Sequence, residues 1–482
     1  MKHCLYLFAL LALVGCSVNP ATGKRQFTAL MSEAKERQIG AESHPKAIAS
    51  FGGEIQNKKI SAYVNDLGQQ LAQHTERPDV RYTFTTLDSP VVNAFAIPGG
   101  YIYITRGILA LANDEAELAG VIGHEIGHIT GRHSAERYSQ SLLVGLGANV
   151  ASAVIDVPGA GNALGLGSQL VLTSYSREQE READRLGVRY LNREGYQPIA
   201  MADFLAQLQR DETYQRSLKD GDSLRSGGGL DAYFRTHPLT AERVQNATQE
   251  AKQYLNFTQR NRDKYLSVID GMVYGPSPKE GFVRGQDFLH PDLNFKFTAP
   301  DGFEIINQPN AVIVKKDKII AQLDIDSKAK GIDPLKYLQT WRPNGVEQWN
   351  IEPLNVNGFK GANAFADVFV QNTPAILRNV ALLGPKNNMF RFQIITPSNL
   401  ARSSNSELLT MVNSFDDLTQ NDREVAKPHF IKIVTAKSGQ SVRDIANSIP
   451  DIYKNRESLF RTLNGMQVDE TLIAGRKYKT IR

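Results

Sequence analysis

The chain has 482 residues, of which 41% are hydrophobic and 22% are charged, and its formal net charge is +4. This composition is typical of a folded globular protein and excludes a wholly disordered, collagen-like or coiled-coil chain. The length predicts two or three domains. Lys and Arg residues are scattered rather than clustered, which argues against nucleic-acid binding. We therefore expect a multidomain protein with packed cores and no nucleic-acid partner.

The N-terminus has the pattern of an export signal. Lys2 precedes an apolar run, Leu5 to Val14, that is too short to span a bilayer as a mature helix. The run leads into Gly15-Cys16, and Leu13-Val14-Gly15-Cys16 resembles the bacterial lipobox, in which the cysteine is lipidated after cleavage. The alternative is an ordinary signal peptide with a chance cysteine. We expect residues 1–15 to be a lipoprotein signal peptide and Cys16 to carry the lipid.

The residues after the cysteine bear on location. Ser17 resembles the pattern of lipoproteins that are sent to the outer membrane, so we expect a protein anchored there, facing the periplasm, with residues 16–30 as a lipidated tether. The two cysteines, Cys4 and Cys16, both lie at the N-terminus. Any metal bound further along the chain must therefore be held by His, Asp or Glu rather than by thiolates.

A helical and then a β section follow. Apolar residues recur at helical spacing between Met31 and Ala72. Residues 81–87, 93–96 and 101–104 then read as strands, and the last two are joined by a Pro98-Gly99-Gly100 turn. This order predicts a small sheet beside helices.

The next predicted helix carries the chemistry. Asp114 and Glu117 have the spacing of a capping box at its start. His124 and His128 lie four positions apart, about 40° from each other on one helix face, so both can bind one zinc ion. Glu125 is held beside that face. This is the H-E-x-x-H pattern, in which the glutamate takes a proton from a water molecule that zinc acidifies. We expect one zinc per chain.

A zinc site of this kind needs a third protein ligand from another segment. The predicted helix 176–194 contains Glu178, Glu180 and Glu182, which either form a solvated charged face or supply that ligand. Glu180 and Asp184 are four positions apart and face the same way. Glu180 can therefore bind the metal while Asp184 orients a ligand histidine.

These motifs together resemble the gluzincin peptidase family that contains HtpX-type heat-shock proteases, CAAX prenyl proteases and periplasmic BepA-like proteases. In that family an E-x-x-x-D signature on the helix after the zinc helix supplies the third ligand, which selects Glu180 over Glu182. The likeness covers about residues 27 to 275 and includes Asn93-Ala94-Phe95-Ala96, Thr105-Arg106-Gly107 and Arg235-Thr236-His237-Pro238-Leu239. It implies a zinc endopeptidase whose catalytic residues are Glu125, Asp184 and His237, with substrate laid along the 93–96 edge strand.

His237 lies in a short loop before a predicted helix that begins at Pro238. It is either a helix-capping scaffold residue or a functional one. In BepA-like relatives the matching histidine can occupy the fourth zinc position. Both an inhibitory ligand and a hydrogen-bond donor to the reaction intermediate stay open for it. His133, five residues past His128, is expected to point elsewhere and to be structural.

The C-terminal part predicts two further domains. After Gly275-Pro276-Ser277-Pro278 the sequence becomes strand-rich, and residues 285–420 predict an α+β domain of unknown role. Residues 428–482 resemble a LysM-like module, which implies a βααβ fold and contact with peptidoglycan. The family's Asp-Thr is replaced by Gln440-Ser441 in this chain.

The sequence thus predicts an α+β multidomain protein. Its main part, residues 31–275, is a mainly helical zincin-type metalloprotease domain with a small sheet, followed by the α+β domain and the LysM-like module. We expect a lipid-anchored periplasmic zinc metalloendopeptidase that hydrolyses unfolded or misassembled envelope proteins in quality control. The alternative is a lipoprotein chaperone or cell-wall-binding module with little proteolytic activity.

Overall fold

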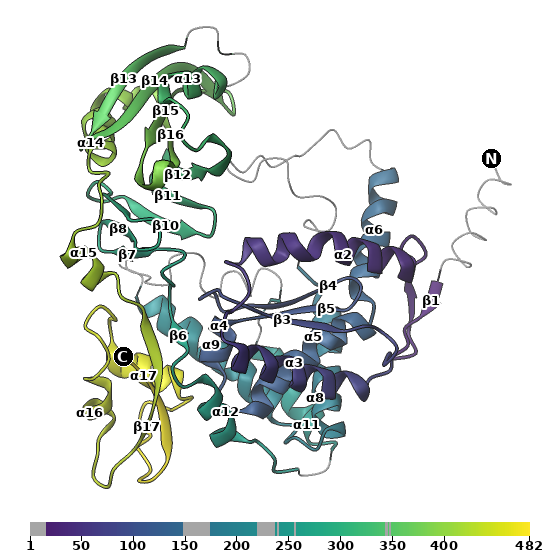
Figure 1. The fold of residues 1–482 in the computed structure, drawn as a ribbon. Coiled ribbons are helices and arrows are strands. Elements are labelled where there is room, and N and C mark those ends of the chain that lie inside the picture. The colour runs from purple at the N-terminus through teal and green to yellow at the C-terminus, as the bar shows by residue number, and fades with distance from the viewer. Residues whose placement is uncertain are drawn as a thin grey trace, which may run out of the picture. The chain divides into compact units, whose positions relative to one another are not determined.

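The computed structural model describes residues 16–147, 174–218, 237–238, 241–254, 257–342, 346 and 349–482. The expected signal peptide, residues 1–15, lies outside this part of the chain. The chain divides into two compact units (Figure 1). The first consists of Met1–Ser217, Gly228–Tyr274 and Phe430–Arg482, and the second of Leu218–Gly227 and Gly275–His429.

The first unit contains the predicted small sheet. Its strands are β3 (Thr83–Leu87), β4 (Ala94–Ile97) and β5 (Tyr101–Thr105), in the order β3-β5-β4. β3 runs parallel to β5 and β4 runs antiparallel to it. The turn between β4 and β5 contains Gly99 and Gly100, both with positive φ, a conformation that glycine adopts without steric cost. The predicted strands are confirmed, and β4 lies at one edge of the described sheet.

Helices cover both faces of this sheet (Figure 1). Because side chains alternate along a strand, Phe95 and Tyr103 pack with Ala47 of α2 (Glu33–Ser50) on one face. Gly68 of α3 (Lys58–Gln73) packs directly against the ring of Phe84 on the other. The other helices described before the C-terminal part of this unit are α4 (Arg106–Leu111), α5 (Glu115–Thr130), α6 (His133–Gly147), α8 (Arg177–Arg193), α9 (Ala200–Ser217), α11 (Ala241–Ala251) and α12 (Arg262–Ile269).

Helix α5 is the predicted zinc helix, and all of its residues are buried. Asp114 Oδ1 accepts a hydrogen bond from the backbone N–H of Glu117 at 2.9 Å. Glu117 in turn accepts one from the N–H of Asn113, one residue earlier than a capping box requires. These two hydrogen bonds fix the start of α5.

Glycines bring α5 against α8. A Cβ at Gly123 would lie 3.2 Å from the Cα of Gly187, and one at Gly127 would lie 3.2 Å from the Cα of Ala183. Side chains larger than hydrogen at these positions would push the two helices apart. This close packing places the ligands of α5 next to those of α8.

The segment expected to be the lipidated tether, residues 16–30, begins with a hairpin. Strands β1 (Cys16–Val18) and β2 (Arg25–Phe27) pair antiparallel as a hairpin. Asn19 is only 2% exposed, and its Oδ1 accepts a hydrogen bond from the N–H of Ala21 at 2.9 Å. An asparagine that hydrogen-bonds the backbone two residues on forms a tight turn, so the segment folds back instead of extending.

The C-terminal part of the first unit has the predicted strand–helix–helix–strand order. Its elements are β17 (His429–Thr435), α16 (Val442–Ala446), α17 (Arg456–Leu463) and β18 (Lys477–Ile481). β17 lies between β18 and β6 (Val273–Tyr274) in one sheet. Lys479 Nζ donates to the carbonyl oxygens of Ala110 and Ala112 at 2.8 and 2.7 Å. This module therefore packs onto the segment that leads into the zinc helix.

The second unit contains a seven-stranded antiparallel sheet and a three-stranded one. Two aromatic and aliphatic clusters fill its core, one against α14 and one against α13. Its helices are η1 (Ser327–Ala329), α13 (Pro334–Thr340), η2 (Pro385–Asn387), α14 (Ser398–Asn413) and α15 (Gln420–Val425). In spatial order, the large sheet is made of β10 (Glu304–Gln308), β11 (Ala311–Lys316), β12 (Ile319–Asp326), β16 (Met389–Pro397), β15 (Thr373–Leu383), β14 (Phe359–Val370) and β13 (Asn350–Val356). The small sheet is made of β7 (Phe282–Arg284), β8 (Asp287–His290) and β9 (Phe295–Thr298).

The prediction of an α+β multidomain chain is confirmed, while the likeness of the last module to LysM stays a prediction. Across the described residues, no helix combines the length and the apolar character needed to cross a membrane.

Candidate metal centre

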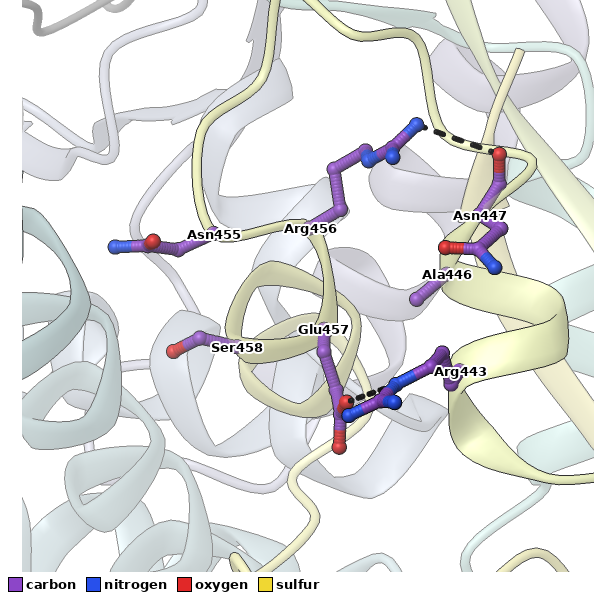
Figure 2. A pocket seen from close by; sticks show the side chains of 7 residues that line it. All are labelled: Arg443, Ala446, Asn447, Asn455, Arg456, Glu457 and Ser458. Atoms are coloured by element: carbon purple, nitrogen blue, oxygen red, sulfur yellow. Dashed lines mark hydrogen bonds and ion pairs between the residues drawn. The ribbon is translucent and has the colours of Figure 1, made fainter.

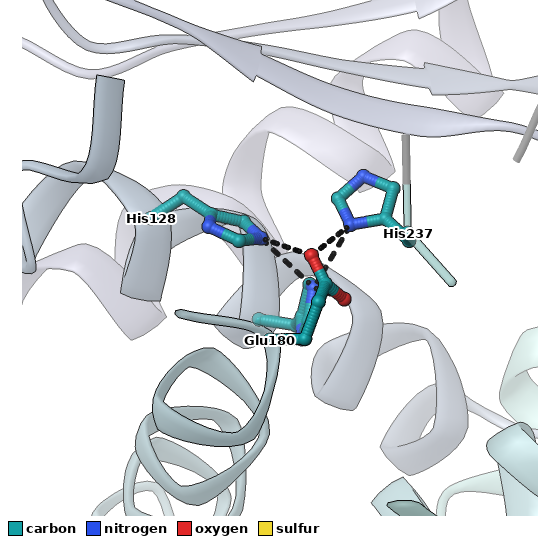
Figure 3. A group of neighbouring side chains, drawn as sticks. His128, Glu180 and His237 are labelled. Atoms are coloured by element: carbon teal, nitrogen blue, oxygen red, sulfur yellow. Dashed lines mark hydrogen bonds and ion pairs between the residues drawn. The ribbon is translucent and has the colours of Figure 1, made fainter. Parts of the chain in front are cut away.

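Four buried side chains converge between α5 and α8. His124 and His128 come from α5, Glu180 comes from α8, and His237 precedes α11. One nitrogen or oxygen atom of each lies within 4.8 Å of the others. Figure 3 shows His128, Glu180 and His237 pointing toward one another. The structure thus brings together the three predicted ligands and His237, for which the sequence left two roles open.

The spacing of these atoms fits a tetrahedral zinc site. Zinc bonds of about 2.0–2.1 Å to nitrogen and oxygen place tetrahedral ligand atoms about 3.3 Å apart. His124 Nε2 lies 3.1 Å from His128 Nε2 and 3.3 Å from His237 Nδ1. Glu180 Oε1 lies 3.0 Å from the same His237 nitrogen and 3.4 Å from His128 Nε2. Three imidazole nitrogens and one carboxylate form a donor set that zinc prefers.

The charge of the cluster also fits a cation. Burial opposes ionisation of Glu180, but His237 and Arg243 hold its pKa well below the usual range. Burial raises the pKa of Glu125, which is fully buried. Among the residues that the structure describes, neither carboxylate oxygen of Glu125 has a hydrogen-bond partner. A positive ion at the cluster would compensate the buried carboxyl group of Glu125.

Asp184, which the sequence predicts to orient a ligand histidine, contacts His124. Its Oδ1 lies 2.9 Å from His124 Nδ1, so that nitrogen carries the hydrogen and Nε2 is left to bind a metal. Arg243 donates to both carboxylate oxygens of Asp184, at 2.8 and 2.7 Å, and lies 2.8 Å from Glu180 Oε2. Burial works against ionisation of Asp184, but Arg243 lowers its pKa.

Sequence reasoning missed Arg243. A signal existed, because two carboxylates predicted to lie inside the protein need a buried cation, and arginine suits a bidentate contact.

His133 does not point away from the site, so that expectation is wrong. Helix α5 ends at Thr130, and Arg132 has a φ of 54° in the turn that follows. The chain reverses there, and His133 Nδ1 comes within 2.9 Å of His128 Nδ1. The prediction failed because it continued the helix past its end.

Tyr175 was also not foreseen. Its ring stacks on the ring of His128 at a centroid distance of 3.7 Å. The guanidinium of Arg137 lies over the ring of Tyr175 at 3.9 Å. The stack limits the rotation of His128 and shields it from solvent.

His237 contacts both the ligand cluster and the predicted base. Its Nδ1 lies 3.0 Å from Glu180 Oε1, while its Nε2 lies 3.6 Å from Glu125 Oε1. Burial lowers the pKa of His237, but the carboxyl groups of Glu180 and Glu125 outweigh this effect and raise it. The position of its Nδ1 atom is that of a fourth ligand in the cluster.

The predicted substrate edge is covered. All four residues of β4 are buried, and Phe95 is 3% exposed. A peptide can pair with this edge only after the covering residues move.

A separate hollow lies on the C-terminal module (Figure 2). It has a volume of about 370 Å³ and is lined by Arg443, Ala446, Asn447, Asn455, Arg456, Glu457 and Ser458. Arg443 pairs with Glu457, and Arg456 donates to the carbonyl oxygen of Asn447. No histidine is among its lining residues, in contrast to the cluster between α5 and α8.

Comparison with known proteins gives one matching family. Residues 58–251 match the model for peptidase family M48, and this segment contains every residue of the metal centre. The chain is 28% identical over 248 residues to the beta-barrel assembly-enhancing protease of Escherichia coli strain K12, covering 49% of this chain and 48% of that protein.

Two mitochondrial proteins are also similar. The identity is 24% over 227 residues to the metalloendopeptidase OMA1 of Schizosaccharomyces pombe, covering 47% of this chain and 63% of that one. It is 22% over 254 residues to the human metalloendopeptidase OMA1, covering 50% and 46%. The chain spans about half the length of the curated relatives it matches.

Proposed function

Because residues 58–251 are a peptidase family M48 domain, we propose that this protein is a zinc-dependent metalloendopeptidase of the cell envelope. The observation that carries this proposal is the convergence of His124, His128 and Glu180 around one buried point, beside Glu125. These are the ligands and the base that hydrolysis of a peptide bond by a gluzincin needs.

His124, His128 and Glu180 would hold the zinc ion. When bound, zinc supplies Lewis acidity that makes a water molecule easier to deprotonate and polarises the scissile carbonyl. Glu125 accepts the proton of that water and returns it to the leaving amine. Burial raises the pKa of Glu125, which makes its carboxylate a stronger proton acceptor. Asp184 holds His124 in the required tautomer.

The proposed substrates are unfolded or misassembled envelope proteins. Once the residues that cover it move, an extended segment would pair with β4, whose backbone runs along the sheet edge nearest to α5. Support comes from the similar Escherichia coli protein, which is a beta-barrel assembly-enhancing protease. Client proteins with exposed strands would fit such an edge.

Turnover of unfolded casein by the purified protein tests this function. We expect cleavage that a zinc chelator abolishes and that added zinc restores. The competing proposal is a chaperone or cell-wall-binding lipoprotein, which the βααβ order of the LysM-like module supports. Retained binding of casein or peptidoglycan without cleavage would favour that second function and contradict the first.

We further propose that Cys16 carries a lipid that anchors the protein in the outer membrane, facing the periplasm. The lipobox-like sequence before it supports this location. Cys16→Ala should release the protein from the membrane fraction, because acyl chains supply the binding energy of such an anchor. Fractionation after a high-salt wash checks this, and a variant that stays membrane-bound contradicts the lipid anchor.

His237 is proposed to lower the basal activity of the enzyme while no substrate occupies the site. Its Nδ1 belongs to the ligand cluster, so a neutral imidazole at this position leaves no place for the reacting water. His237→Ala should therefore raise basal proteolysis, including self-cleavage, while the other three ligands retain zinc. Initial rates of both proteins on casein provide the measurement. A slower variant would instead mean that His237 donates a hydrogen bond to the developing oxyanion.

A further inference from the structure

The two histidines of α5 are supported differently. His124 Nδ1 contacts a carboxylate directly, at 2.9 Å from Asp184 Oδ1. His128 Nδ1 contacts a second imidazole instead, at 2.9 Å from His133 Nδ1. Metal-binding histidines usually fix their orientation by donating the free ring N–H to an acceptor. His133 must therefore act as that acceptor for His128.

The direction of each hydrogen bond follows from the positions of the protons. His128 directs Nε2 toward the ligand cluster, 3.4 Å from Glu180 Oε1, so a neutral His128 carries its hydrogen on Nδ1. That N–H donates to His133 Nδ1, which leaves the His133 hydrogen on Nε2. His133 Nε2 lies 3.3 Å from Glu182 Oε1 and donates to it. Each contact then has one donor and one acceptor.

Glu182 is held in turn by the N-terminal hairpin. Asn19 Nδ2 donates to Glu182 Oε1 at 2.6 Å and is also 3.3 Å from the carbonyl oxygen of Gly131. Asn19 follows β1 and closes the turn to β2. The hairpin therefore contributes a buried side chain to this network.

We propose that His133, Glu182 and Asn19 form a positioning relay for the zinc ligand His128. The relay makes the hairpin at Cys16–Phe27, which begins at the proposed lipid-bearing cysteine, part of the metal centre. This inference rests on the proposed function, since it concerns the same zinc site. It also gives a role to Glu182, which the family resemblance passed over in favour of Glu180 as the third ligand and which the structure places outside the ligand cluster.

Zinc affinity of the full chain, measured by competition with a chromophoric chelator, tests the relay without reference to peptidase activity. His133→Phe removes both ring nitrogens and should weaken zinc binding by about 10–100-fold, the usual cost of losing such a support. His133→Gln is the matched variant, because its amide can accept from His128 and donate to Glu182. We expect it to restore most of the affinity.

Two further variants keep the test decisive. Asn19→Ala, at the far end of the relay, should weaken zinc binding in the same direction but less, and it serves if His133→Phe does not fold. Glu178→Gln is the control on α8, because Glu178 is 76% exposed and pairs with Lys24, and it should bind zinc like the parent.

The outcomes separate the two proposals. Parental zinc affinity in His133→Phe and Asn19→Ala would overturn the relay alone, as would a His133→Gln variant as weak as the Phe variant. A parent protein that binds no zinc would overturn the proposed function, and the relay with it.

Discussion

Glu125→Gln should abolish most peptidase activity while leaving zinc binding intact. The amide cannot accept the proton of the attacking water, and general-base catalysis contributes about 10²–10⁴-fold to the rate. Because Glu125 lies outside the ligand set and has the same shape as glutamine, the cluster should keep its geometry. Initial rates on unfolded casein, with zinc content determined on the same samples, measure both effects.

Glu178→Gln provides the matched control for this substitution. It makes the same chemical change at an exposed glutamate of α8, and its rate should equal that of the parent. A Glu125→Gln protein that cleaves casein as fast as the control would show that another group accepts the proton.

Arg243→Met should strongly destabilise the metal-free protein. Arg243 is 3% exposed and neutralises the carboxylates of Glu180 and Asp184 together. Removing one partner of a buried ion pair typically costs about 3–5 kcal/mol, because the remaining charge stays buried without compensation. Urea denaturation of the zinc-free protein should show a much lower midpoint for the variant.

Arg243→Lys separates charge from geometry in the same experiment. Lysine keeps the positive charge but cannot make the bidentate contact with Asp184, so its midpoint should fall between those of the parent and the Met variant. Equal midpoints for the parent and Arg243→Met would contradict the role of this arginine.

The sequence was sufficient where a local pattern determines the structure. The four-residue spacing of His124 and His128 requires only that the segment be a helix, and the alternation at 101–104 requires only a strand. The pairing of Glu180 with Asp184 on one face follows from the same periodicity. All three expectations are met by α5, β5 and α8.

Sequence reasoning failed where distant segments meet. Asn19 and Glu182 are far apart in the chain, and no periodicity links them. The orientation of His133 depends on where α5 ends, and the end of a helix is harder to predict from sequence than the helix itself. The contacts of Arg243 with the carboxylates of α8 depend on how α11 packs beside α8, and the sequence pattern of one segment does not predict such a tertiary contact.

The zinc content of the purified protein tests the central claim most directly. Elemental analysis should find one zinc per chain in the parent, because one cluster of suitable ligands is present among the described residues. The His124→Ala, His128→Ala double variant, which removes two of the three proposed ligands, should contain none. Full zinc occupancy in that double variant would contradict the assignment of this site.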